Sequence, residues 1–208
     1  MQPAPGLRER KKLRTRATLI DAAVDLCGRQ GFDRTTVDQI AATADVSPRT
    51  FSRYFVTKDA VALALVDEML DLVAAELAVQ PPELTVFEAL KRAYLQMAYG
   101  ARHGVPGAVS ADRFLQIVQI LVSSPALQQT ALEFRGNPVD VAVAARLGTA
   151  VDDRRVKLVA GVFNGVLVTA VCALPGGPQD LVALGVDGVI ATFEAVYADF
   201  LTEVAGLG

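Results

Sequence analysis

The sequence predicts an all-α protein: a small N-terminal unit of three helices, then a larger helical bundle, about nine helices in all. Apolar residues recur at helical spacing through most of the chain, and no stretch alternates convincingly as a β-strand would. Helix-start and helix-stop residues divide this pattern into segments. The 208 residues are 52% hydrophobic and 21% charged, which is enough for a buried core and excludes long disordered regions.

Composition also narrows the chemistry. Cys27 and Cys172 are the two cysteines and His103 is the one histidine, so neither a disulfide framework nor a His-rich metal site nor a His-based triad is expected. No nucleotide-binding Gly-rich loop or nucleophile elbow occurs, and Asp152-Asp153 is typical of a helix start. We therefore expect no catalysis, no cofactor and no metal.

Charge is distributed unevenly. The first 60 residues hold eleven Lys and Arg against seven Asp and Glu, whereas the remainder holds nine against sixteen. Most of the basic excess lies in one run: Arg8, Arg10, Lys11, Lys12, Arg14 and Arg16. Such a run is by itself compatible with a solvated tail. Next to a DNA-reading motif it becomes a phosphate-binding arm, because neutralising phosphates releases counterions.

Membrane insertion is not expected. The chain opens on a polar, Pro-rich stretch and then the basic run, which is not the pattern of a signal peptide. The uncharged segment Leu158–Leu174 is shorter than the roughly 20 residues of a membrane span, and Gly161, Asn164 and Gly165 interrupt it. This segment favours a buried helix of a cytoplasmic protein.

Residues 15–55 contain three helix patterns. The first runs from Thr15 to a stop at Gly31. Thr36-Val37-Asp38-Gln39 has the capping-box form and opens a helix of about two turns. Ser47 caps a third helix, with Pro48 in its first turn. This helix is expected to reach Phe55 and to turn the rings of Phe51 and Phe55 inward. Its other side chains are then left on the outside.

Two short helices joined by a tight turn, the second bearing exposed Arg and hydroxyl groups, describe a helix-turn-helix. The major groove of B-DNA admits one α-helix, and Arg and hydroxyl side chains hydrogen-bond to base edges there. The sequence therefore predicts binding to double-stranded DNA.

The N-terminal domain of TetR-family transcriptional regulators resembles residues 12–60. The resemblance is carried by the following residues: Gly31-Phe32, Thr35-Thr36-Val37, Ile40-Ala41, Ala44, Val46-Ser47, Thr50-Phe51, Tyr54-Phe55 and Lys58-Asp59. It implies that the second helix of the motif reads the major groove. It also implies phosphate contacts from Lys58 and from Thr35 or Thr36. Many relatives have an aromatic residue where this chain has Ser52, so the contact that this ring makes is expected either to be weaker here or to be supplied by Tyr54 and Arg53.

The implied DNA-contacting set is Thr35, Thr36, Ser47, Pro48, Arg49, Thr50, Ser52, Arg53, Tyr54 and Lys58. Thr36 and Ser47 would cap helices whether or not they touch DNA. Tyr54 could also pack partly into the domain. We assign residues 1–57 to an N-terminal arm and DNA-binding domain, and residues 58–208 to a ligand-binding and dimerisation domain.

The second domain is expected to contain further helices, separated by Pro- and Gly-rich breaks. Their approximate ranges are 58–79, 85–102, 108–123, 126–135, 141–147, 152–174 and 179–204. The second of these opens on another capping-box form, Thr85-Val86-Phe87-Glu88. The helix over 152–174 is apolar nearly all round and needs two covering surfaces. The last helix has a face of small residues, which suits close packing across a two-fold axis: Gly185, Gly188, Thr192 and Ala195. The resemblance implies a homodimer through these two helices, which places two recognition helices about 34 Å apart.

The resemblance also implies a pocket for a small-molecule effector. Candidate lining residues are Tyr94, Met97, Phe114, Ile117, Phe134, Phe163 and Asn164. The apolar ones serve equally well as ordinary core. Asn164 needs a hydrogen-bond partner if it is buried, and a ligand, a water or the opposite subunit would supply one. Scarce charge at these positions points to an apolar or weakly polar effector.

The predicted function is that of a repressor, which binds a palindromic operator as a dimer and is released by its effector. One alternative is a constitutive DNA-binding protein whose C-terminal core is filled. Another, of a different class, is an enzyme or lipid-binding protein in which the N-terminal motif is incidental.

Overall fold

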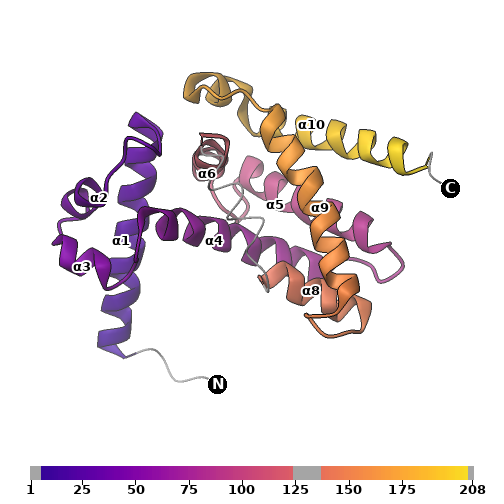
Figure 1. Ribbon diagram of the computed structural model, residues 1–208, viewed down its shortest axis with the longest axis horizontal. Helices are drawn as coiled ribbons and strands as arrows, with labels where there is room; N and C mark the ends of the chain where they lie inside the picture. The colour runs from indigo at the N-terminus through magenta and orange to yellow at the C-terminus, as the bar shows by residue number, and fades with distance from the viewer. Residues whose placement is uncertain (1–5, 124–136, 206–208) are drawn as a thin grey trace. The chain divides into compact units, whose positions relative to one another are not determined.

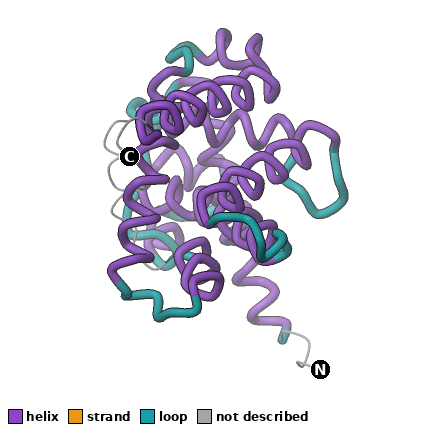
Figure 2. Tube along the Cα trace, turned by 90° about the vertical axis from the view of Figure 1, so that its right-hand side faces the viewer, coloured by secondary structure: helices purple, strands orange, loops and turns teal. Residues whose placement is uncertain are grey.

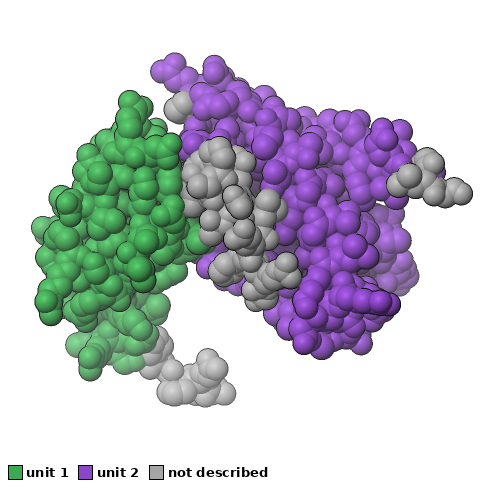
Figure 3. Space-filling view, in the orientation of Figure 1, with its two compact units in different colours: residues 1–65 green, residues 66–208 purple. Residues whose placement is uncertain are grey.

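A computed structural model describes residues 6–123 and 137–205 of this chain. All of its described secondary structure is helical, in nine helices that Figure 1 labels α1–α6 and α8–α10. The expected helix over 126–135 and Phe134 lie outside the described residues. The chain divides into two compact units, residues 1–65 and 66–208 (Figure 3). This division falls within α4 (Lys58–Ala78), whose Val61 and Leu65 are buried residues of the first unit.

The first unit contains α1 (Leu7–Gln30), α2 (Val37–Thr43), α3 (Pro48–Ser52) and the start of α4. The helix α1 begins eight residues earlier than expected, so the basic run of the N-terminal arm is itself helical. Leu, Arg, Lys and Glu, which fill these first turns, are strong helix formers. The buried face of α1 begins only at Leu19.

The starts of α2 and α3 agree with the expected caps. Thr36 and Gln39 form a complete capping box, with Thr36 Oγ1 accepting from Gln39 N at 3.2 Å. Ser47 caps α3, and Pro48 is its first residue. The turn between the two helices has Asp45 at φ 53, a left-handed conformation that Asp tolerates better than most residues. The helix α3 ends at Ser52, three residues before the expected end.

The second unit is a bundle of α5 (Val86–His103), α6 (Ala111–Ser123), α8 (Pro138–Leu147), α9 (Arg154–Ala173) and α10 (Pro178–Ala205) with the rest of α4 (Figure 2). A second capping box, from Thr85 and Glu88, starts α5. The helix α8 begins at Pro138, three residues before the expected start, because Asn137 Oδ1 accepts from two backbone amides and Pro138 needs no amide partner.

The helix α10 is interrupted at Gly185, whose φ of 67° and ψ of −179° are not helical. An L-residue with a side chain rarely adopts this φ, so Gly185 serves a sharp bend in the backbone. In the sequence it belonged to the small-residue face of a straight helix. A Cβ on Gly188 would clash with the partly exposed side chain of Leu184, so a larger residue there would require that side chain to move.

Among the described residues, α9 and residues 179–205 of α10 are each long and apolar enough to cross a membrane by length and composition. In each of the two helices, only 28% of the most apolar stretch of 18 residues is buried. The core side of α9 is formed by Val156, Val159, Phe163, Val166 and Ala170. Both helices therefore have a second apolar face that their own unit leaves uncovered.

Candidate DNA interface and effector pocket

The outer face of α3 is formed by the side chains that its packing leaves outside. Phe51 is fully buried, and its ring lies 5.9 Å from that of Phe55. This fixes the rotation of the helix, and the exposed residues are then Ser47, Pro48, Arg49, Ser52 and Arg53. Thr50 and Tyr54, also predicted to contact DNA, are half-buried.

Hydroxyl groups on this face are partly engaged within α3. Ser47 Oγ accepts from Thr50 N at 3.1 Å and lies 3.0 Å from Thr50 Oγ1. Ser52 Oγ donates to Pro48 O at 3.1 Å. Within the described residues, by contrast, neither Arg49 nor Arg53 has a hydrogen bond or ion pair. The two guanidinium groups are thus the strongest unengaged donors on α3.

Thr35 and Thr36 differ in what they can reach. Thr35 is 1% exposed, and its hydroxyl donates to Gly31 O at 2.9 Å inside the domain. Thr36 is exposed at the N-terminus of α2. Of the two hydroxyls that the sequence left open for phosphate contact, the geometry favours Thr36. The expected contact from Thr35 does not fit its burial.

Lys58 has a role inside the first unit that the sequence did not reveal. Its Nζ donates to Phe32 O at 2.9 Å and to Asp33 O at 3.3 Å, and lies 4.4 Å from the centre of the Phe32 ring. The half-buried ammonium therefore ties the start of α4 to the loop after α1. Cys27 is buried nearby in the same core, and burial raises the pKa of its thiol.

The second unit contains a cavity of about 200 Å³. Of the seven predicted lining residues, five line it: Tyr94, Met97, Phe114, Phe163 and Asn164. Ile117, also predicted to line the pocket, is buried in the core and is not among the residues that line this cavity. Helical spacing places it with Phe114 and Val118, but the direction of each side chain from α6 depends on tertiary packing.

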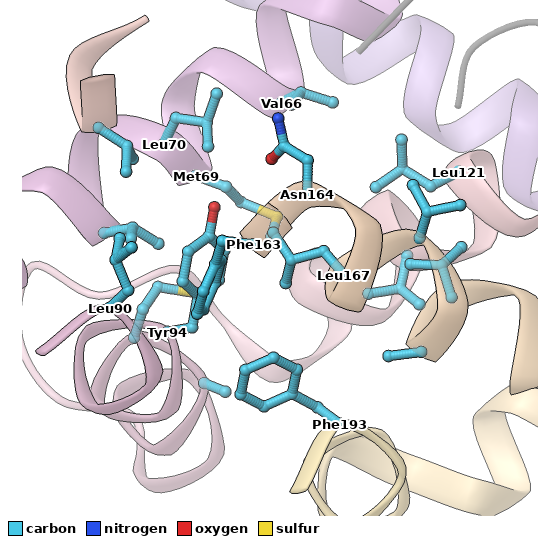
Figure 4. A pocket seen from close by; sticks show the side chains of 18 of the residues that line it. Val66, Met69, Leu70, Leu90, Tyr94, Leu121, Phe163, Asn164, Leu167 and Phe193 are labelled. Carbon is cyan, nitrogen blue, oxygen red and sulfur yellow. The ribbon is translucent and has the colours of Figure 1, made fainter. Parts of the chain in front are cut away.

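Aromatic rings form one wall of this cavity. Tyr94 lies 5.3 Å from Phe163 and 6.3 Å from Phe193 between ring centres, and Phe163 lies 6.2 Å from Phe193. In Figure 4 the Tyr94 hydroxyl and the Asn164 amide lie on the side of the cavity that Val66 and Met69 border. Burial, with a smaller effect from the Asp140 charge, raises the pKa of Tyr94. The hydroxyl therefore stays protonated and can donate a hydrogen bond.

Two further groups of lining residues were missed. One is on α4: Val66, Met69, Leu70 and Val73. The other is the polar pair Asn137 and Asp140 at the start of α8, which are 8% and 9% exposed. A cap residue followed by Pro is a local signal for a helix start, which the sequence analysis did not assign here, and nothing local indicates that this start borders a cavity. No cluster of His, Cys, Asp or Glu suited to a metal occurs within the described ranges.

The fold, the site and the comparison with known proteins together identify the class of protein. A small helical unit whose exposed α3 projects two arginines, followed by a helical bundle with a cavity, defines a helix-turn-helix transcriptional regulator. Residues 19–65 match the model of "Bacterial regulatory proteins, tetR family". The regulator TcmR of Streptomyces glaucescens is 34% identical over 167 residues, which cover 78% of this chain and 74% of TcmR. The chain belongs to the TetR family of transcriptional regulators.

Similarities to two more distantly related proteins agree with this family assignment. The regulator RutR of Escherichia coli strain K12 is 26% identical over 199 residues, which cover 96% of this chain and 81% of RutR. The structure of SmeT in complex with triclosan superposes with a TM-score of 0.52 at 19% identity, covering 89% of this chain and 91% of that one. At this identity the likeness concerns the fold.

The position of Lys58 leads to a stability prediction. Replacing it by Met keeps most of the aliphatic stem but leaves the Phe32 and Asp33 carbonyls without their donor. We expect Lys58→Met to destabilise the first unit by about 1–3 kcal/mol. Denaturant unfolding without DNA measures this, with Lys11→Met, at an exposed position of α1 in the same unit, as control. Equal stability of the two variants would show that the ammonium has no structural role.

Proposed function

We propose that this regulator is a repressor, which binds a palindromic operator as a homodimer and is released by a small, largely apolar effector. The observation that carries the proposal is the outer face of α3. There the burial of Phe51 projects Arg49 and Arg53 outward without partners among the described residues. One such helix from each subunit would enter successive major grooves.

The roles on DNA follow from reach and exposure. Arg49 and Arg53 suit base reading, since a guanidinium can make two hydrogen bonds to a guanine edge. Pro48, Ser52, Thr50 and Tyr54 complete the surface of α3 that faces the groove. Thr36 and Ser47, each at a helix N-terminus, suit backbone phosphates. Lys58 uses two donors internally and keeps one N–H for a phosphate.

The DNA-binding proposal is tested by selection of duplexes from a random-sequence library. The full chain is expected to enrich a palindromic sequence. Arg49→Ala should then weaken binding to that duplex by about 1–3 kcal/mol and relax its sequence preference. Arg29→Ala is the matched control, because Arg29 is exposed on the same unit but paired with Asp25 at 2.7 Å. If no duplex is enriched at low salt, the proposal fails.

The cavity supports an effector of limited size. An engineered cavity of about 150 Å³ holds benzene, so a space of about 200 Å³ suits one or two rings. Tyr94, Phe163 and Phe193 offer ring faces, while the Tyr94 hydroxyl and Asn164 amide offer hydrogen bonds at one side. Single polar groups in an apolar pocket typically fix orientation. This favours an aromatic molecule with one polar group.

Helix α4 supports a coupling between effector and DNA. It begins at Lys58, which is bonded to the loop after α1, and its later residues Met69 and Leu70 line the cavity. A ligand that favours one position of α4 changes operator affinity by its differential affinity for that position. An open cavity also counts against a constitutive DNA-binding protein with a filled core.

The effector proposal predicts that the apolar fluorophore N-phenyl-1-naphthylamine binds the protein and brightens. Leu167→Trp, which fills the cavity from α9, is expected to weaken this binding at least tenfold. Val141→Trp is the control, because Val141 is exposed on α8. The chain has no natural Trp, so the new residue also reports folding by its own emission. Equal binding by both variants would exclude this cavity as the site.

The outward faces of α9 and α10 support the homodimer. On α9, Leu158 is 67% exposed, and Gly161, Gly165 and Cys172 continue the same face. On α10, uncharged small residues recur at alternating steps of three and four, a spacing typical of paired helices. These are Gly188, Ala191, Ala195, Ala198 and Thr202, which we call the α10 stripe. Exposed apolar surfaces of this kind are typical of protein interfaces. In a two-fold dimer the same surface of a second copy of the chain would cover them.

A buried charge in the α10 stripe should prevent dimerisation. Ala195→Glu is expected to yield monomers in sedimentation velocity at concentrations where the unmodified chain is dimeric, because an unpaired carboxylate at a helix interface is costly. Ala145→Glu, an exposed alanine of α8, should leave the dimer intact. If both variants dimerise, the α10 stripe is not part of the dimer interface.

The remaining elements of the proposal follow from family membership. TetR-family regulators are normally not enzymes, and they are soluble and generally cytoplasmic. This supports a DNA-binding regulator over the alternative of an enzyme or lipid-binding protein. The outward apolar faces of α9 and α10 are then assigned to the partner subunit and not to a membrane.

A further inference from the structure

A charged side chain borders the cavity of the second unit. Asp140, in the first turn of α8, is 9% exposed and is one of the lining residues. Among the described residues that line the cavity there is no Lys, Arg or His. The formal charge of the described lining is therefore negative, although the rest of it is almost entirely apolar.

Helix stability does not by itself require a carboxylate at this place. The N-terminus of a helix favours negative charge, but an exposed Asp provides that benefit and keeps its hydration. Asp112 is an example, since it is exposed in the first turn of α6. Removing a carboxylate from water is costly unless donors or a cation compensate it. A carboxylate has about four acceptor positions, so Asp140 can accept from a ligand in addition to contacts within the protein.

Uncharged acceptors lie near this carboxylate. After burial, the Asp140 charge is the second cause that raises the pKa of Tyr94, so the carboxylate is within electrostatic range of that hydroxyl. In Figure 4 the Tyr94 hydroxyl and the Asn164 side chain lie on the same side of the cavity. The oxygen atoms of both side chains can accept a hydrogen bond from an N–H group. The polar groups of the cavity therefore suit a ligand that donates.

The aromatic wall of the cavity adds attraction for a cation. The face of an aromatic ring carries partial negative charge and attracts ammonium groups. Tyr94, Phe163 and Phe193 all line the cavity, with ring centres 5.3 to 6.3 Å apart. An organic cation is thus attracted by the ring faces and by the carboxylate, whereas an anion is repelled by both.

From these observations we infer that the cavity selects an aromatic amine in its protonated form, and that Asp140 determines this preference for positive charge. The ammonium group donates to the Asp140 carboxylate, while the aromatic part packs against Phe163 and Phe193. A carboxylate of the same shape is excluded by repulsion from Asp140. The inference rests on the proposed effector cavity and narrows the polar group of the effector to a cation.

Three naphthalene compounds of similar shape test the inference on the full chain. At neutral pH 1-naphthylmethylamine is a cation, 1-naphthalenemethanol is uncharged and 1-naphthoate is an anion. Each competes with the uncharged probe N-phenyl-1-naphthylamine, and the loss of fluorescence gives its dissociation constant. The amine is expected to bind about tenfold more tightly than the alcohol, because hydrogen bonds between charged groups are the stronger ones. The naphthoate should bind most weakly.

Two matched variants assign the preference to one side chain. Asp140→Asn keeps the shape of the side chain and removes its charge, so it should weaken binding of the amine about tenfold, leave the alcohol nearly unchanged and strengthen binding of the naphthoate. Asp112→Asn removes an exposed charge from the first turn of α6 and should change none of the three. Binding of the uncharged probe shows that each variant is folded.

The series on the unmodified chain is decisive even without the variants. If the naphthoate binds as tightly as the amine, or if Asp140→Asn retains the full preference for the amine, the inference is overturned. If the probe does not bind the unmodified chain at all, the proposed effector cavity itself fails, and this inference fails with it.

Discussion

Burial of Phe51 is the constraint on which the DNA-binding surface depends. A helix of five residues has almost no stability of its own in water, because the unfavourable free energy of helix nucleation exceeds the stabilisation from the hydrogen bonds of one turn. The helix α3 exists because its Ser47 cap satisfies an amide and its Phe51 ring fills the core of the first unit. That single contact also sets the rotation of α3, so Arg49 and Arg53 point outward as a consequence of packing.

In the second unit the burial of apolar side chains is less complete than in the first. Aromatic and aliphatic side chains from six helices surround a cavity instead of closing on it. Empty space in a core costs stability, so its persistence needs compensation elsewhere. The paired rings of Tyr94 and Phe163, the caps of α5 and α8, and the broad contact between α9 and α10 supply that support. A ligand would recover part of the lost contact energy.

Much of the architecture was predictable, because helix caps are local. Thr36 with Gln39, Ser47 with Pro48 and Thr85 with Glu88 each act within four residues, and each lies where the sequence indicated. The family resemblance could also be recognised from the sequence, since one short segment of the chain carries it. Less could be said of α10, where a glycine interpreted as a packing surface instead bends the backbone at Gly185.

The sequence by itself determined the helices, their caps, the helix-turn-helix and the basic character of α1, all of which depend on neighbouring residues. Only the tertiary structure decided that Thr35 faces the core, that Lys58 bonds to two carbonyls 25 and 26 residues earlier, and that Ile117 does not face the cavity. The lining contributed by Met69 and Asp140 was likewise decided there. Helical periodicity gives the face on which a side chain lies, but its partner depends on which distant helix packs against that face.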